Sequence, residues 1–119
     1  SLIAIDLSEY SSITMKELNS IYKGKKKVYI ALVKETINYN NAFNMNVLTA
    51  MIKNSTQKYQ LLFIDKLNET NLEKLNSYTK QKKYNDNEIL VYEVGNKKFK
   101  LKEKIKITSK EEMKEKQNL

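Results

Sequence analysis

Short runs of apolar residues alternate along the chain with segments in which apolar residues recur every three or four positions. The runs at 2–7, 28–33, 59–64 and 88–94 have the length of strands. The run at 28–33 is apolar throughout, which is typical of a central strand that is buried on both faces. The segments at 14–22, 42–52 and 70–79 have helical spacing, so the pattern predicts strands separated by helices.

Residues with capping chemistry mark the ends of two of these helices. Thr14 and Thr70 are each followed three positions later by a glutamate, which is the spacing of a capping box. Gly24 follows the first helix, where a left-handed C-terminal cap favours a residue without a side chain. The third helix is expected to bury one face, made of Leu72, Leu75, Tyr78 and Thr79.

The last strand is expected to pair with the strand before it through a two-residue hairpin turn at Gly95-Asn96. Its residues alternate, with Phe99, Leu101, Ile105 and Ile107 on one face. The other face carries a row of lysines, Lys98, Lys100, Lys102, Lys104 and Lys106. This row is either a solvated surface, which also discourages edge-to-edge aggregation, or a basic surface that follows a phosphate backbone. We favour the solvated surface.

The resulting order is β-α-β-α-β-α-β-β-α, an α/β fold with a mixed central sheet between helices. Strands joined through helices are expected to run parallel, and the hairpin makes the last pair antiparallel. We interpret residues 1–107 as one domain and 108–119 as a short polar C-terminal helix or tail.

Composition removes several kinds of chemistry. The chain has no Cys, His, Pro or Trp and only two glycines. The usual zinc sites, disulfides, histidine-activated nucleophiles and glycine-rich phosphate loops therefore lack their residues. We expect no metal and no cofactor. The three carboxylates of Glu35, Asp65 and Glu88 fall at strand ends, where open α/β sheets place their sites, but ordinary turn and cap roles explain them better than acid–base catalysis.

The net charge of +8 comes from 22 lysines and no arginine, and most of the excess lies after residue 96. Arginine supplies the bidentate contacts of phosphate and guanine recognition, so its absence does not favour specific nucleic-acid recognition. We interpret the many lysines and the 14 asparagines as the codon bias of an AT-rich genome. Tyr78, Lys80, Lys82, Lys83 and Tyr84 could stack bases beside a basic groove, but a buried Tyr78 with solvated lysines is the simpler interpretation.

The order and lengths of these elements resemble a thioredoxin-like domain, and in particular the small thioredoxin-like proteins of AT-rich Gram-positive bacteria that are associated with bacteriocin transport. In that family a Cys-x-x-Cys motif follows the central strand, and Ile37, Asn38, Tyr39 and Asn40 stand at the motif position. A cis-proline segment precedes a later strand, and Glu88 stands at the proline position, before Ile89-Leu90-Val91-Tyr92. Asp65 matches an Asp that often ends the family's third strand.

The resemblance implies that Ile37–Asn40 and Glu88 face each other, and that Tyr39 and Glu88 line a groove for an extended peptide. Dithiol–disulfide exchange needs two thiols, so the chain is expected to be redox-inactive and not an enzyme. Its partner is then a protein or a peptide. The alternative is a basic nucleic-acid-binding α/β domain that uses the lysines of the last strand. No membrane span is expected. The chain begins with Ser1, as expected if a leader or anchor has been removed, and the compartment stays open.

Overall fold

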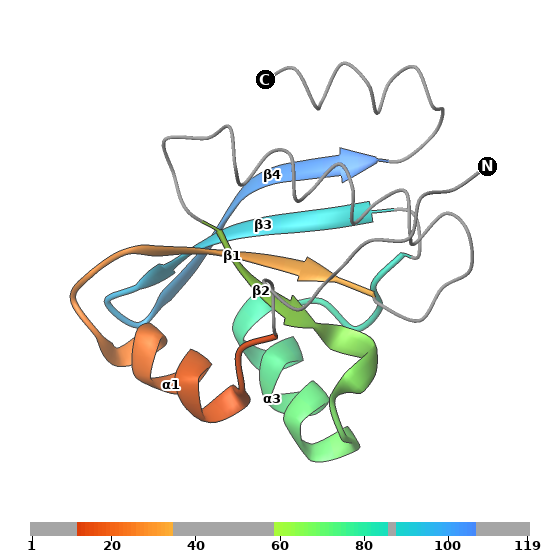
Figure 1. Cartoon of the computed structure of the whole chain (residues 1–119), viewed down its shortest axis with the longest axis horizontal. Coiled ribbons are helices and arrows are strands. Elements are labelled where there is room, and N and C mark those ends of the chain that lie inside the picture. The colour runs from red at the N-terminus through yellow and green to blue at the C-terminus, as the bar shows by residue number, and fades with distance from the viewer. Residues whose placement is uncertain (1–11, 35–58, 86–87, 107–119) are drawn as a thin grey trace.

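A computed structural model describes residues 12–34, 59–85 and 88–106, which form a mixed α/β arrangement of a four-stranded sheet and two α-helices (Figure 1). The elements are α1 (Met15–Lys23), β1 (Val28–Val33), β2 (Tyr59–Phe63), the short 3₁₀ helix η2 (Ile64–Lys66), α3 (Glu69–Thr79), β3 (Glu88–Gly95) and β4 (Lys98–Lys106). These elements confirm the α/β class. The elements expected at 2–7, 42–52 and 109–119 lie outside the described residues.

The strand order in the sheet is β2-β1-β3-β4. β1 and β2 are parallel, whereas β3 is antiparallel to both β1 and β4. The expectation that all strands joined through helices run parallel was therefore wrong for β3. The reason is the connection after α3, because residues 82–85 return to Lys34 and Asp65 at the end of the sheet that the chain left after β2.

Both α-helices pack on one face of the sheet, below it in Figure 1. Met15 and Leu18 of α1 and Leu75 of α3 join a core with apolar side chains of β1, β2 and β3. The opposite face is also apolar and buried, through Ala31, Val33, Leu61, Phe63, Ile89, Val91 and Ile105. Burial on both faces explains why these strands read as continuous apolar runs.

The helix caps follow the expected chemistry only in part. The capping box at Thr14 is confirmed, since Glu17 N–H donates to Thr14 Oγ1 at 3.1 Å and Thr14 N–H donates to Glu17 Oε1 at 3.0 Å. The box predicted at Thr70 was wrong, because Asn68 caps α3 by accepting from Asn71 N–H at 2.8 Å. Gly24 ends α1 with φ −75° and ψ 161°, an extended conformation rather than the left-handed cap.

The hairpin turn is one residue later than its sequence suggested. Asn96 and Lys97 form the turn, with φ of 53° and 60°, and Gly95 pairs with Lys98. The amide of Asn96 donates to Gly24 O and that of Lys97 to Tyr22 O, both at 2.7 Å, so the turn satisfies carbonyls at the end of α1.

A register shift in the hairpin changes which side chains share a face of β4. Tyr92 pairs with Leu101 but Val91 pairs with Glu103, so Lys102 is an extra, bulged residue. Residues that pair across strands share a face, and the shift therefore reverses the alternation at this point. Phe99, Leu101 and Lys104 lie on the helix-covered face, whereas the opposite face carries Lys98, Lys100, Glu103 and Ile105.

The expected separation of apolar and basic faces along the last strand was thus wrong. It assumed an unbroken period of two, and the single extra residue transfers the following positions to the other face. The lysines of β4 are divided between the two faces. Ile107 lies outside the described residues.

Candidate functional site

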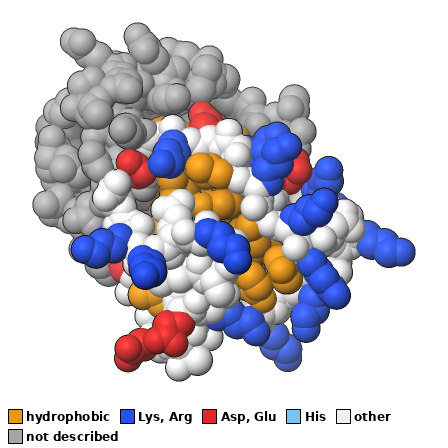
Figure 2. Space-filling model, turned by 180° about the vertical axis from the view of Figure 1, so that it is seen from behind, with side chains coloured by type: hydrophobic (Ala, Val, Ile, Leu, Met, Phe, Trp, Pro, Cys, Tyr) orange, Lys and Arg blue, Asp and Glu red, His pale blue; other side chains and the backbone are white. Residues whose placement is uncertain are grey.

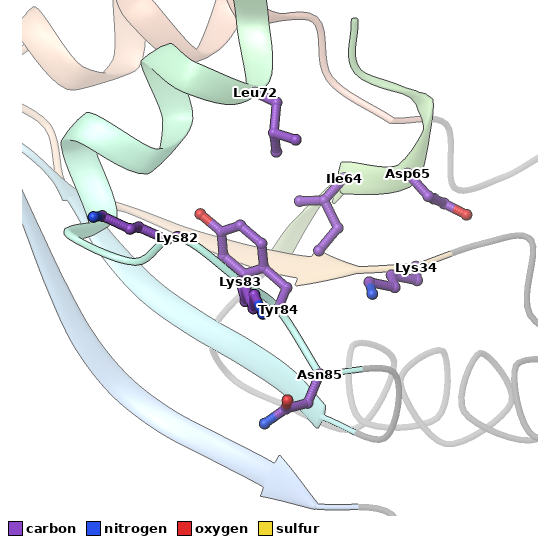
Figure 3. A pocket seen from close by; sticks show the side chains of 8 residues that line it. All are labelled: Lys34, Ile64, Asp65, Leu72, Lys82, Lys83, Tyr84 and Asn85. Carbon is purple, nitrogen blue, oxygen red and sulfur yellow. The ribbon is translucent and has the colours of Figure 1, made fainter. Parts of the chain in front are cut away.

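A hollow of about 460 Å³ lies at the carboxyl ends of the two parallel strands (Figure 3). β1 leads directly into Lys34, and β2 leads into Ile64 and Asp65 of η2. The remaining lining residues come from α3 and from the connection that follows it: Leu72, Lys82, Lys83, Tyr84 and Asn85. Carboxyl ends of parallel strands are the usual position of ligand sites in open α/β sheets, which makes this hollow the candidate site.

The floor of the hollow is apolar. Figure 3 shows Ile64, Leu72 and Tyr84 converging from three different elements. Ile64 is only 6% exposed, and Leu72 and Tyr84 are half-buried. These side chains would accommodate one apolar side chain of a ligand.

Hydrogen bonds hold Tyr84 in place. Its hydroxyl lies 2.8 Å from Oγ1 of the buried Thr79, which in turn donates to Leu75 O. Burial raises the pKa of Tyr84 above the usual value for a phenol. Tyr84 therefore stays neutral at physiological pH and serves as a fixed part of the floor.

The rim of the hollow carries more positive than negative charge. Its lining includes three lysines, Lys34, Lys82 and Lys83, and one acidic residue, Asp65. Lys82 and Lys83 are exposed, whereas Lys34 is half-buried. An apolar floor with a lysine rim has the chemistry to bind an anionic group that carries an apolar side chain, and the surplus of lysines favours negatively charged ligands.

Of the residues that the resemblance assigns to a peptide groove, only Glu88 lies within the described part of the chain. It begins β3, at the same end of the sheet as the hollow, because Leu90 of β3 pairs with Leu32 near the end of β1. Asn85 connects it to the hollow, since Asn85 Nδ2 donates to Glu88 Oε1 at 3.1 Å and Glu88 N–H donates to Asn85 O at 3.3 Å.

The other expected residues have separate outcomes. Ile37, Asn38, Tyr39 and Asn40, together with Glu35, lie outside the described residues, so their juxtaposition with Glu88 stays a prediction. Asp65 lines the hollow, as expected for a carboxylate that follows a strand.

The aromatic–lysine segment does not form a free stacking platform. Tyr78 stacks against Tyr22 and Phe99, with ring centroids 4.3 and 5.1 Å apart, and its hydroxyl donates to Asn19 Oδ1 at 2.7 Å. α3 ends at Thr79, so the lysines that follow belong to the connection rather than to a helix face.

The sequence grouped Lys82, Lys83 and Tyr84 only as part of a possible base-stacking surface, and it did not place Lys34 or Leu72 beside them. The available signal was position, because Lys34 directly follows a buried strand just as Asp65 does. The chain between α3 and β3 gave no such signal. Its return to this end of the sheet depends on the antiparallel direction of β3.

Among residues 12–34, 59–85 and 88–106 there is no group of three or more acidic, His or Cys side chains that could hold a metal ion. None of the helices within these ranges is long and apolar enough to cross a membrane. Comparison with family models, with curated proteins and with solved structures yields no match to the chain.

Proposed function

We propose that the chain is a redox-inactive thioredoxin-like domain that binds an extended peptide or protein segment without reacting with it. The mixed α/β arrangement of the described elements, from α1 to β4, is compatible with that fold. The observation that carries the proposal is the hollow beside Glu88, at the end of the sheet where the segment after β1 begins. Ile37–Asn40, the residues at the position of the Cys-x-x-Cys motif, would continue the binding surface from that point.

The chemistry of the hollow indicates which segment it would bind. An apolar side chain would contact Ile64, Leu72 and Tyr84, and neighbouring carboxylates would lie beside the exposed Lys82 and Lys83. The expected ligand is therefore a segment in which acidic residues flank an apolar one. Because the chain has no Cys, it has no thiolate that could form a mixed disulfide with this segment.

A peptide-display selection tests this proposal. Randomised seven-residue peptides are selected on the wild-type chain, and the enriched peptides are measured by calorimetry. We expect acidic peptides with one large apolar residue, and a roughly tenfold loss of affinity when Lys82 and Lys83 are both changed to Ala. Lys16→Ala combined with Lys23→Ala removes the same charge from exposed positions on α1, which does not line the hollow, and serves as the matched control. Equal losses in the two double variants would contradict binding at the hollow.

The alternative of nucleic-acid binding depended on one basic face of the last strand. The bulge at Lys102 places Lys98 and Lys100 on one face and Lys104 on the other. A salt titration of binding to random DNA tests the alternative, because contacts with phosphates would make the affinity fall steeply as salt increases. The structure gives no specific observation in its favour, and we do not advance it.

A further inference from the structure

The outer edge of β4 is a second surface with the properties of a binding site. β4 is the last strand in the order β2-β1-β3-β4, and no other described strand pairs with its outer side. Gly95 and Lys98 flank a two-residue turn and so form a hydrogen-bonded pair. The alternation of an antiparallel ladder then directs the backbone groups of Phe99 and Leu101 outward.

The side chains along this edge are basic, with one exposed apolar residue. Lys98, Lys100, Lys102 and Lys104 are exposed, and Glu103 is the one acidic residue of β4. Leu101 is 41% exposed and is the one large apolar side chain in the described part of the chain that is exposed. Figure 2 shows apolar atoms bordered by lysines on the side of the molecule opposite the view of Figure 1.

We propose that an extended acidic segment of a partner protein binds as an added strand along the outer edge of β4. Main-chain hydrogen bonds to Phe99 and Leu101 would provide affinity that does not depend on sequence. Acidic side chains of the partner would lie beside Lys100 on one face and Lys104 on the other, and an apolar side chain would cover Leu101. The bulge at Lys102 matters because it gives both faces of the edge a lysine.

Charge favours an acidic partner over a second copy of this chain. Pairing of β4 with β4 would bring lysines together across the new ladder, and like charges that face each other destabilise a sheet. The whole chain also carries a net charge of +8, which opposes self-association. The edge is separate from the hollow of the proposed function, so either surface can be tested alone.

The test measures binding of the acetylated and amidated peptide Glu-Thr-Val-Glu-Val-Glu-Thr to the full chain by NMR titration of backbone amides. In antiparallel pairing this sequence can place a glutamate beside Lys104, a valine over Leu101 and a glutamate beside Lys100. We expect shifts concentrated at 99–104. Two further peptides carry N-methyl groups on either the odd-numbered or the even-numbered residues. One of the two is expected to bind about tenfold more weakly, because N-methylation removes the main-chain donors that face β4.

A second experiment tests the same proposal with charge variants of the chain. Lys100→Glu combined with Lys104→Glu is expected to weaken binding of the unmodified peptide about tenfold. Lys16→Glu combined with Lys74→Glu makes the same charge change at exposed positions on α1 and α3 and should leave the affinity within about twofold.

Four results would overturn the proposal. The first is equal affinity of all three peptides, which would indicate ionic attraction without strand pairing. The second is amide shifts concentrated at 82–85, which would place the peptide in the hollow and support only the proposed function. The third is dimerisation of the chain through β4 in sedimentation, and the fourth is no binding of the acidic peptide.

Discussion

Gly95 illustrates how one residue joins two elements of this fold. Its φ is 157°, and a Cβ added there would lie 2.7 Å from the carbonyl oxygen of Lys26. We expect Gly95→Ala to lower the free energy of unfolding by about 2 kcal/mol or more, because either the hairpin or the chain after α1 must move. Urea denaturation followed by circular dichroism measures this loss.

Gly24 provides the matched control for that substitution. Its φ is −75°, and the nearest atom to an added Cβ is Ser20 O at 3.3 Å. Gly24→Ala should change the stability by less than about 1 kcal/mol. If both alanine variants were equally stable, the close approach of the hairpin to Lys26 would be refuted.

At the scale of elements, the register of the β3–β4 hairpin gives a direct test of the bulge. Glu88 pairs with Lys106 across the bulged ladder, whereas an unbroken alternation from Gly95 and Lys98 would pair Glu88 with Ile105. The chain has no Cys, so engineered thiols have no competitors. We expect Glu88→Cys with Lys106→Cys to form a disulfide in air, because partners in an antiparallel ladder have the required Cα separation.

The control pair is Glu88→Cys with Ile105→Cys, whose side chains lie on opposite faces of the hairpin. Thiol titration before and after reduction should find most of the first variant oxidised and most of the second still reduced. The opposite result would mean that the strand continues without a bulge, and the lysines of β4 would then share one face after all.

The sequence was informative where a local rule fixes an element. The apolar runs identified β1, β2 and β3, the alternation after the hairpin signal identified β4, and the Thr14–Glu17 spacing identified the start of α1. It was uninformative where two distant segments decide the geometry. The turn at Asn96–Lys97 contacts the end of α1, and the bulge at Lys102 brings Ile105 opposite Ile89. Neither contact leaves a periodic signal.

The site was predictable to a similar extent. The strand-end rule drew attention to Asp65, although a turn or cap role was preferred for it, and the family resemblance pointed to Glu88, which adjoins the hollow through Asn85. The position of Lys82, Lys83 and Tyr84 at the hollow was not predictable, because the direction of β3 brings them there. The sequence predicted that β3 runs parallel to β1 and β2. A parallel β3 would begin at the other end of the sheet, and the connection after α3 would then lie away from the hollow.

For the whole molecule, the absence of His and Cys means that no side chain has an ordinary pKa between about 5 and 9. In the part of the chain that the structure describes, four tyrosines have shifted pKa values. Burial raises the pKa of Tyr84, Tyr92 and Tyr78, and a hydrogen bond to Glu93 is the main cause of the raised pKa of Tyr29. Stability should therefore be nearly constant around neutral pH.

The same pKa shifts predict that the chain loses stability at alkaline pH. A raised folded-state pKa means that the folded chain keeps a proton that the unfolded chain has released, so the stabilisation is fully present below the unfolded pKa of about 10 and is lost as the pH rises through the folded pKa. Urea midpoints measured from pH 7 to about 11 should fall only above about 10. Lysines titrate in the same range, and Tyr84→Phe with Tyr92→Phe separates their effect, because it keeps every lysine and should flatten the fall. If the double variant lost stability as steeply as the wild type, these phenols would not be the cause of the alkaline unfolding.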